Sequence, residues 1–181
     1  MRQIICLLLI GLLACTFIVS DGETASDPLK ISDAAPDFTL QDADDGVHTL
    51  KELRGKVVIL IMGNRKIRKE DDKWARAFQK DYKENDRVVA YIIADMRSVP
   101  GFIPKGFIKN QLKKNKPPVT LLLDWMGEVH EAYHTQKEKP NLYIIEPEGQ
   151  IAFYLKANFN EETYQQVKTV IDSKLKLMRE E

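Results

Sequence analysis

Three apolar runs that contain β-branched residues constrain the fold of this chain more than any other feature. They cover residues 57–62, 88–94 and 119–123, and only the third is interrupted, by Thr120. Strands that are buried on both faces have this composition, and they occur in parallel sheets covered by helices. Amphipathic stretches with helical spacing separate the runs, at about 70–82 and 102–116. This alternation predicts a three-layer α/β fold with a central sheet flanked by helices.

The last third of the sequence predicts an antiparallel addition to this sheet. We expect a short helix at about 128–135, strands at 142–145 and 151–155, and a long amphipathic helix at about 160–178. A Pro-Glu-Gly turn at 147–149 joins the two strands and makes them antiparallel neighbours. The central sheet is therefore expected to be mixed.

The first 20 residues carry one arginine, an unbroken apolar stretch and a return to polar residues, which is the pattern of an export signal. We expect a signal peptide at 1–20, a flexible tether at 21–35 and a folded domain at 36–181. The alternative is a lipoprotein leader that ends at Ala14 and leaves Cys15 as the lipidated residue. Either route leads to a bacterial periplasm or to a lipid anchor in the cell envelope, and the leader or the lipid is the only membrane contact expected.

Charge and cysteine content exclude two classes of function. Arg2 is the single charged residue in 1–20, which leaves 26 of the 27 basic side chains against all 27 acidic ones, without the basic excess that nucleic acid requires. Both cysteines, Cys6 and Cys15, lie in the leader. The folded domain therefore has no thiol for disulfide exchange, and we expect no cofactor in it.

Three segments resemble the redoxin branch of the thioredoxin-like fold, the AhpC/TSA type that includes peroxiredoxins. They are APDFTL at 35–40, LKELRGKVV at 50–58 and PNLYIIEPEGQI at 140–151. The resemblance covers roughly residues 34–178 and implies a three-layer thioredoxin-like fold. It implies less about chemistry, since one fold supports many activities.

The same resemblance implies where the redox groups would stand. The family's paired cysteines fall at Ile67 and Glu70 and its cis-proline falls at Pro140, so both thiols are missing. Segments at 61–65, 107–117 and 124–129 are also similar to YtfJ-like periplasmic proteins, which look like thioredoxins without the cysteines. We therefore expect a degenerate redox site.

Two features of that site have alternative interpretations. The cations that precede the helix at 70–82 either hold an anion at its N-terminus or form surface pairs with the acidic residues at 70–72. These cations are Arg65, Lys66, Arg68 and Lys69. Pro140 either keeps the former active-site groove open for an extended peptide, as a cis-proline, or only shapes its turn.

His130, Glu131 and His134 spell H-E-x-x-H, which on a helix places two imidazoles one turn apart for a zinc ion. The alternative is a surface helix in which Val129 and Tyr133 face the core and both histidines are solvated. The sequence offers no evident third ligand. We expect no metal site under the second interpretation.

Two functional classes remain. The preferred one is a non-catalytic binding or accessory module of the cell envelope, whose partner is an envelope protein or peptide of unknown identity. The alternative is an enzyme, either a redoxin-like oxidoreductase without its own thiol or a metal-dependent hydrolase that uses His130, Glu131 and His134.

Overall fold

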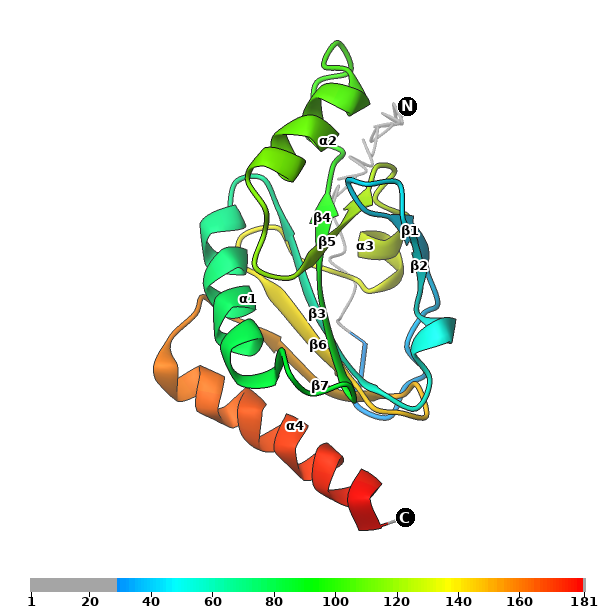
Figure 1. Ribbon diagram of the computed structural model, residues 1–181, viewed down its shortest axis with the longest axis vertical. Helices are drawn as coiled ribbons and strands as arrows, with labels where there is room; N and C mark the ends of the chain where they lie inside the picture. The colour runs from blue at the N-terminus through cyan, green and yellow to red at the C-terminus, as the bar shows by residue number, and fades with distance from the viewer. Residues whose placement is uncertain (1–28, 181) are drawn as a thin grey trace, which may run out of the picture.

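A seven-stranded mixed sheet runs through the molecule with helices on both faces (Figure 1). The structure, a computed structural model, describes residues 29–180, so the expected leader at 1–20, Cys15 and the first part of the tether lie outside the described residues. The strands are β1 (Thr39–Gln41), β2 (Val47–Thr49), β3 (Val57–Asn64), β4 (Val88–Asp95), β5 (Thr120–Asp124), β6 (Asn141–Ile145) and β7 (Ile151–Lys156). The helices are α1 (Arg68–Tyr82), α2 (Lys105–Lys114), α3 (Glu128–Ala132) and α4 (Glu161–Glu180), with a short 3-10 helix at Lys51–Leu53.

The strand order β2-β1-β5-β4-β3-β6-β7 confirms the predicted three-layer α/β arrangement. Strands β3, β4 and β5 are parallel, whereas β6 and β7 add antiparallel strands on one side and β1 pairs antiparallel with β5 on the other. Residues 57–63 of β3 are all buried, as the unbroken apolar run predicts. Within residues 29–180, no helix is both long and apolar enough to cross a bilayer.

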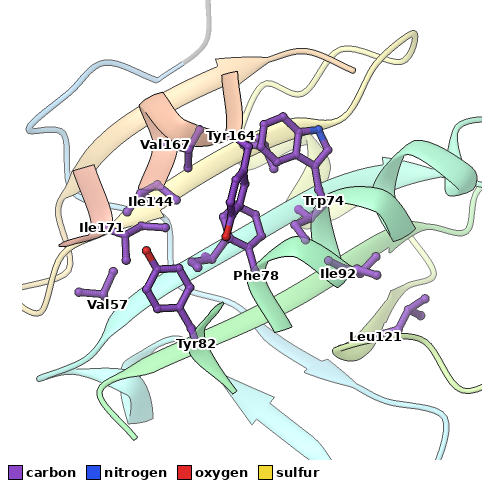
Figure 2. Close-up of a cluster of buried hydrophobic side chains, with 14 of the residues drawn as sticks. Val57, Trp74, Phe78, Tyr82, Ile92, Leu121, Ile144, Tyr164, Val167 and Ile171 are labelled. Carbon is purple, nitrogen blue, oxygen red and sulfur yellow. The ribbon is translucent and has the colours of Figure 1, made fainter. Parts of the chain in front are cut away.

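Alternate residues of β3 feed two separate cores. Ile59 and Ile61 face the layer formed by α1 and α4, where Trp74 packs against neighbouring aromatic rings (Figure 2). Leu60 on the other face meets α3 and the N-terminal segment, with Tyr133 fully buried there. Each large apolar side chain buried in this way contributes about 1.5 to 3 kcal/mol. The two cores fix the sheet between its helical layers.

The elements differ from the prediction at three places. The hairpin β1–β2 joins the sheet although its strands are only three residues long, too short for a clear period in the sequence. Helix α2 begins at Lys105 because Pro104 has an extended backbone with ψ 135°. Helix α3 ends at Ala132 rather than near residue 135, and His134 beyond it has a left-handed backbone with φ 50°.

Residues just before the expected domain start at residue 36 also pair with the sheet. Ser32 N donates to Ile151 O at 2.8 Å and Ile151 N donates to Asp33 O at 2.9 Å. Ala35 N donates to Gly149 O at 3.0 Å, and the Ala35 side chain is buried. The last residues of the expected tether are therefore hydrogen-bonded to β7 and to the turn before it.

Trp74 is fully buried, and its indole Nε1 donates to Ala157 O at 3.1 Å. Trp74→Phe leaves that carbonyl without a donor and opens a gap beneath α4, so we expect the free energy of unfolding to fall by about 2 kcal/mol. Trp125 is the matched control, because its half-buried ring lies under the Lys105 ammonium. Trp125→Phe should cost less than about 1 kcal/mol. Urea denaturation followed by circular dichroism measures both, and equal losses would contradict this assignment of the core.

Candidate functional site

A row of polar residues marks the edge where the three parallel strands end. Asn64, Asp95 and Asp124 are the last residues of β3, β4 and β5, and the sheet register places Asn64 beside Asp95 and Asp95 beside Asp124. Open α/β sheets bind ligands at this edge, outside the carboxyl ends of the strands. The expected strands ended one or two residues earlier, so this row was not predicted. Its signal was a polar residue shortly after every apolar run.

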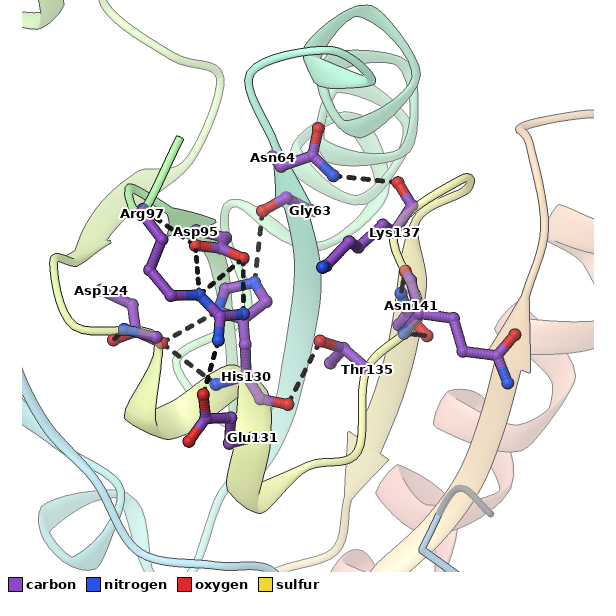
Figure 3. A network of polar contacts seen from close by, with 12 residues as sticks. Gly63, Asn64, Asp95, Arg97, Asp124, His130, Glu131, Thr135, Lys137 and Asn141 are labelled. Carbon is purple, nitrogen blue, oxygen red and sulfur yellow. Dashed lines mark hydrogen bonds and ion pairs between the residues drawn. The ribbon is translucent and has the colours of Figure 1, made fainter. Parts of the chain in front are cut away.

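Asp124 and His130 form a buried pair at one end of this row (Figure 3). Asp124 Oδ2 accepts from His130 Nδ1 at 2.9 Å and from the backbone N of His130 at 3.0 Å, while Oδ1 accepts from Gly127 N at 2.8 Å. Burial alone would raise the pKa of Asp124, but these hydrogen bonds, those of His130 foremost, hold the pKa below its usual value. The carboxylate is therefore ionised and satisfied.

His130 connects α3 to β3 through its other ring nitrogen. Nε2 lies 3.2 Å from Gly63 O, and the residue is only 4% exposed. The Asp124 carboxylate and Gly63 O thus face the two ring nitrogens, one each. An imidazole held in this way has no free nitrogen to act as a base toward a ligand.

Arg97 covers the same edge from the loop after β4. Its Nε and Nη2 donate to the two Asp95 carboxylate oxygens, at 3.0 and 2.7 Å, and Nη1 donates to Glu131 Oε1 at 2.6 Å. The guanidinium stacks over Gly127, where a side-chain Cβ would stand 2.1 Å from Nε, and Gly127 also has φ 77°. Only glycine fits there. Because the guanidinium donates to both carboxylate oxygens, the charges of Asp95 and Arg97 neutralise each other.

The two degenerate redox positions are structural. Ile67 is half-buried at the N-cap of α1. Glu70 lies in the first turn, where its Oε1 accepts from Lys73 Nζ at 2.6 Å and its Oε2 accepts from Phe159 N at 3.2 Å. Glu70 thus connects α1 to the segment before α4, and neither side chain carries a thiol.

The loop before β6 differs from the implied cis-proline turn. No cis peptide bond occurs in residues 29–180, so the Lys139–Pro140 bond is trans, and the hypothesis of a cis-proline that keeps a peptide groove open is wrong. The loop is instead closed by the buried Asn141 side chain, whose Nδ2 donates to Gln136 O at 2.7 Å and to Lys139 O at 3.1 Å. Asn64 Nδ2 also donates to Lys137 O at 2.9 Å. Side-chain amides therefore occupy carbonyls that strand pairing with a peptide would use.

The H-E-x-x-H residues do not share one helical face. Helix α3 ends before His134, His130 is buried, and Glu131 turns outward to Arg97. Among the described residues, no group of three or more His, Cys, Asp or Glu side chains could hold a metal ion. The alternative of a solvated surface helix is wrong for His130, which is buried because Asp124 and Gly63 O satisfy its ring. The zinc geometry that the motif requires is not formed.

An open cavity of about 700 Å³ lies beside this polar row. Both acidic side chains in its lining are already in ion pairs, Asp95 with Arg97 and Glu138 with Lys156 at 3.0 Å. Lys66 and Lys137 have no ion-pair partner within residues 29–180. The cavity is therefore electropositive. Its lining residues are Asn64, Lys66, Ile67, Asp95, Arg97, Ser98, Lys137 and Glu138.

One of the two interpretations placed Asp71 in surface ion pairs, yet its side chain, in the first turn of α1, is 2% exposed. Its carboxyl occupies the place of a side chain at Gly63, where an added Cβ would lie 2.2 Å from Asp71 Oδ2. Burial, together with the charges of Asp72 and Glu70, raises the pKa of Asp71 to about 8, although Arg68 partly opposes this shift. Within the described chain, Oδ1 has no hydrogen-bond partner. The side chain is neutral at pH 7.

Replacing Asp71 tests this carboxyl. The folded protein holds its proton up to about pH 8, whereas the ordinary pKa is 3.8, so the free energy of unfolding falls as pH rises between these values and levels off above. Asp71→Asn removes the titration, so its stability relative to the native chain should increase by on the order of 1 to 3 kcal/mol from pH 5 to pH 8. Urea denaturation at several pH values measures the difference. Asp86→Asn in an exposed loop is the control, and a flat difference for Asp71→Asn would contradict the burial.

Replacing His130 tests the polar row. His130→Ala leaves the Asp124 carboxylate buried without its partner, so we expect a loss of about 3 kcal/mol in the free energy of unfolding. His134→Asn is the matched control and should cost less than about 1 kcal/mol, because asparagine tolerates a left-handed backbone. Equal losses, or a zinc ion retained through dialysis and lost in either variant, would favour the hydrolase interpretation instead.

Comparison with known proteins identifies a matching family and similar solved structures. The AhpC/TSA family matches over residues 31–154, and no curated protein matches the chain. Among solved structures, a protein described as a thiol:disulfide interchange protein DsbE from Chlorobium tepidum aligns with TM-score 0.66 and 20% identity, over 81% of this chain and 99% of that one. A peroxiredoxin-like protein from Aquifex aeolicus aligns with TM-score 0.61 and 17% identity, over 81% and 91%. The exposed lipoprotein thioredoxin Etrx1 from Streptococcus pneumoniae aligns with TM-score 0.60 and 19% identity, over 74% and 98%.

These matches agree with the sheet order and with the helices on its two faces. At such identities the solved structures establish the fold alone, which is thioredoxin-like. The family match spans more than half of the sequence and includes β1 to β6 and most of β7. The chain therefore belongs to the AhpC/TSA family.

Proposed function

We propose that this chain is a non-catalytic binding module of the cell envelope, which holds an acidic peptide segment of a partner protein in the cavity beside Lys66 and Lys137. One observation carries the non-catalytic part. The redoxin reaction needs a thiolate at the N-terminus of α1, and residues 63–70 contain no sulfur. Ile67 and Glu70 stand at the two cysteine positions and serve packing and hydrogen bonding instead.

The charges around the cavity support an acidic ligand. Lys66 and Lys137 both line the cavity, one from the β3–α1 turn and one from the loop before β6. The carboxylates nearby are already paired with Arg97 and Lys156. Two ammonium groups without ion-pair partners among the described residues attract carboxylates and steer them by long-range attraction.

The size of the cavity favours a peptide over a small anion. About 700 Å³ is within the range of about 300 to 1,000 Å³ typical of pockets for drug-sized ligands, and the site is open to solvent. A single phosphate or sulfate would leave most of this space to water. An extended segment with acidic side chains would fill it and reach both lysines.

The N-terminal sequence supports a location in the envelope. An arginine followed by an apolar stretch is the pattern of an export signal, and one similar structure is described as an exposed lipoprotein thioredoxin. Intact-mass measurement of the processed protein distinguishes a lipidated Cys15 from cleavage near Ser20. An unprocessed N-terminus would contradict export.

A charge-reversal experiment tests the ligand. A fluorescein-labelled decapeptide of alternating Glu and Ala is titrated with the full chain, and fluorescence anisotropy gives the Kd. We expect the double variant Lys66→Glu/Lys137→Glu to weaken binding at least about tenfold, because attraction becomes repulsion. The control Lys80→Glu/Lys176→Glu makes the same change in net charge at exposed positions on α1 and α4 and should change Kd by less than about twofold.

Two outcomes would contradict the proposal. Inorganic phosphate that binds as tightly as the decapeptide would indicate a small-anion site. Hydrogen peroxide consumption in the presence of dithiothreitol, above that of a protein-free blank, would favour the alternative of a redoxin-like enzyme that acts without its own thiol.

A further inference from the structure

A second cavity, of about 240 Å³, lies between the β3–α1 junction and α2. It shares only Asn64 with the cavity beside Lys66 and Lys137. Its walls are mostly apolar and come from β4, β5, α2 and the loop between β4 and α2. These apolar lining residues are Ile92, Ala94, Met96, Val99, Ile103, Phe107, Ile108, Leu112 and Leu121.

Helix α2 covers this cavity and is loosely attached. Leu112 is its only buried residue, and Phe107 lines the cavity although it is 57% exposed, so the cavity reaches solvent on this side. Lys109 and Lys113 connect α2 to the β1–β2 turn through ion pairs with Asp45 and Asp44. Surface ion pairs of this kind stabilise little, so the helix can adjust to an occupant.

Four of the five polar lining side chains give the cavity a polar end. Asn64, Arg65, Arg68 and Asp71 come from the end of β3 and the start of α1, whereas Gln111 lies on α2. Asp71 is 2% exposed and its Oδ1 has no partner within residues 29–180. Arg65 forms no ion pair with the described residues, and Arg68 Nε lies 3.9 Å from its nearest carboxylate oxygen, on Asp72. A buried polar group of this kind needs a partner, and the two guanidinium groups can neutralise an anion.

We propose that this cavity binds a medium-chain aliphatic carboxylate, with the hydrocarbon chain beneath α2 and the carboxylate between Arg65, Arg68 and Asp71. The apolar walls match the chain, and the cations match the head group. The neutral Asp71 carboxyl donates a hydrogen bond to the carboxylate, which gives it the partner it lacks. The volume, below that of pockets for drug-sized ligands, limits the chain to medium length.

Chain length gives the first test. Isothermal titration calorimetry of the full chain with hexanoate, octanoate and decanoate should show about fourfold tighter binding for each added methylene until the cavity is full, because each methylene leaves water. Ala94→Leu fills the cavity from β4 and should weaken decanoate binding at least about tenfold without loss of thermal stability. The native chain and the Ala94→Leu variant share the same expected leader, so any decanoate that binds to it cancels in the comparison. Unchanged binding by Ala94→Leu would overturn the site.

The head group gives the second test. Arg65→Gln/Arg68→Gln should weaken decanoate binding at least about tenfold and decanol binding by less than about twofold. Arg76→Gln, at an exposed position on the same helix, is the matched control and should leave both unchanged. Decanol that binds as tightly as decanoate, or a leucine-rich peptide amide that binds more tightly than either, would overturn the proposal. Lys66→Glu/Lys137→Glu should still bind decanoate, so this result is separate from that of the acidic peptide.

Discussion

The burial of β3 on both faces is the constraint on which the rest of the structure depends. The strand pairs along its whole length with β4 and over most of it with β6, so no edge is free. Its alternate side chains complete two cores, and each core needs a helix layer to exclude water. Gly63 and Asn64 at its carboxyl end pair with β4 alone, because the pairing with β6 stops at Met62. Asn64 lines both cavities, so both lie at this end of the strand.

Two buried aspartates at that end are stabilised in opposite ways. Asp124 meets donors from the backbone at Gly127 and from both the ring and the backbone of His130, and it stays ionised. Asp71 lies under the first turn of α1 beside other carboxylates and gains no such donors, so it keeps its proton. The number of donors within reach decides between the two states, since burial alone penalises both charges.

The sequence predicted the helices and strands that are long enough to show a clear hydrophobic pattern. The apolar run at 57–62 and the spacing of Trp74, Phe78 and Tyr82 identified β3 and α1, and the missing thiols followed from the positions of Cys6 and Cys15. Contacts between distant segments were not predictable. Asp71 looked like an ordinary first-turn acid because only the fold places it under Gly63, and H-E-x-x-H looked like a metal motif because the sequence does not show where α3 ends.

The approach of Asp71 to Gly63 links two positions that are eight residues apart and lie on different elements. The carboxyl fills the space that any Cβ at position 63 would need. An aspartate that fills this space is compatible only with glycine at position 63. The residue at the end of the strand and the residue in the first turn of the helix therefore restrict each other across the junction between the two elements.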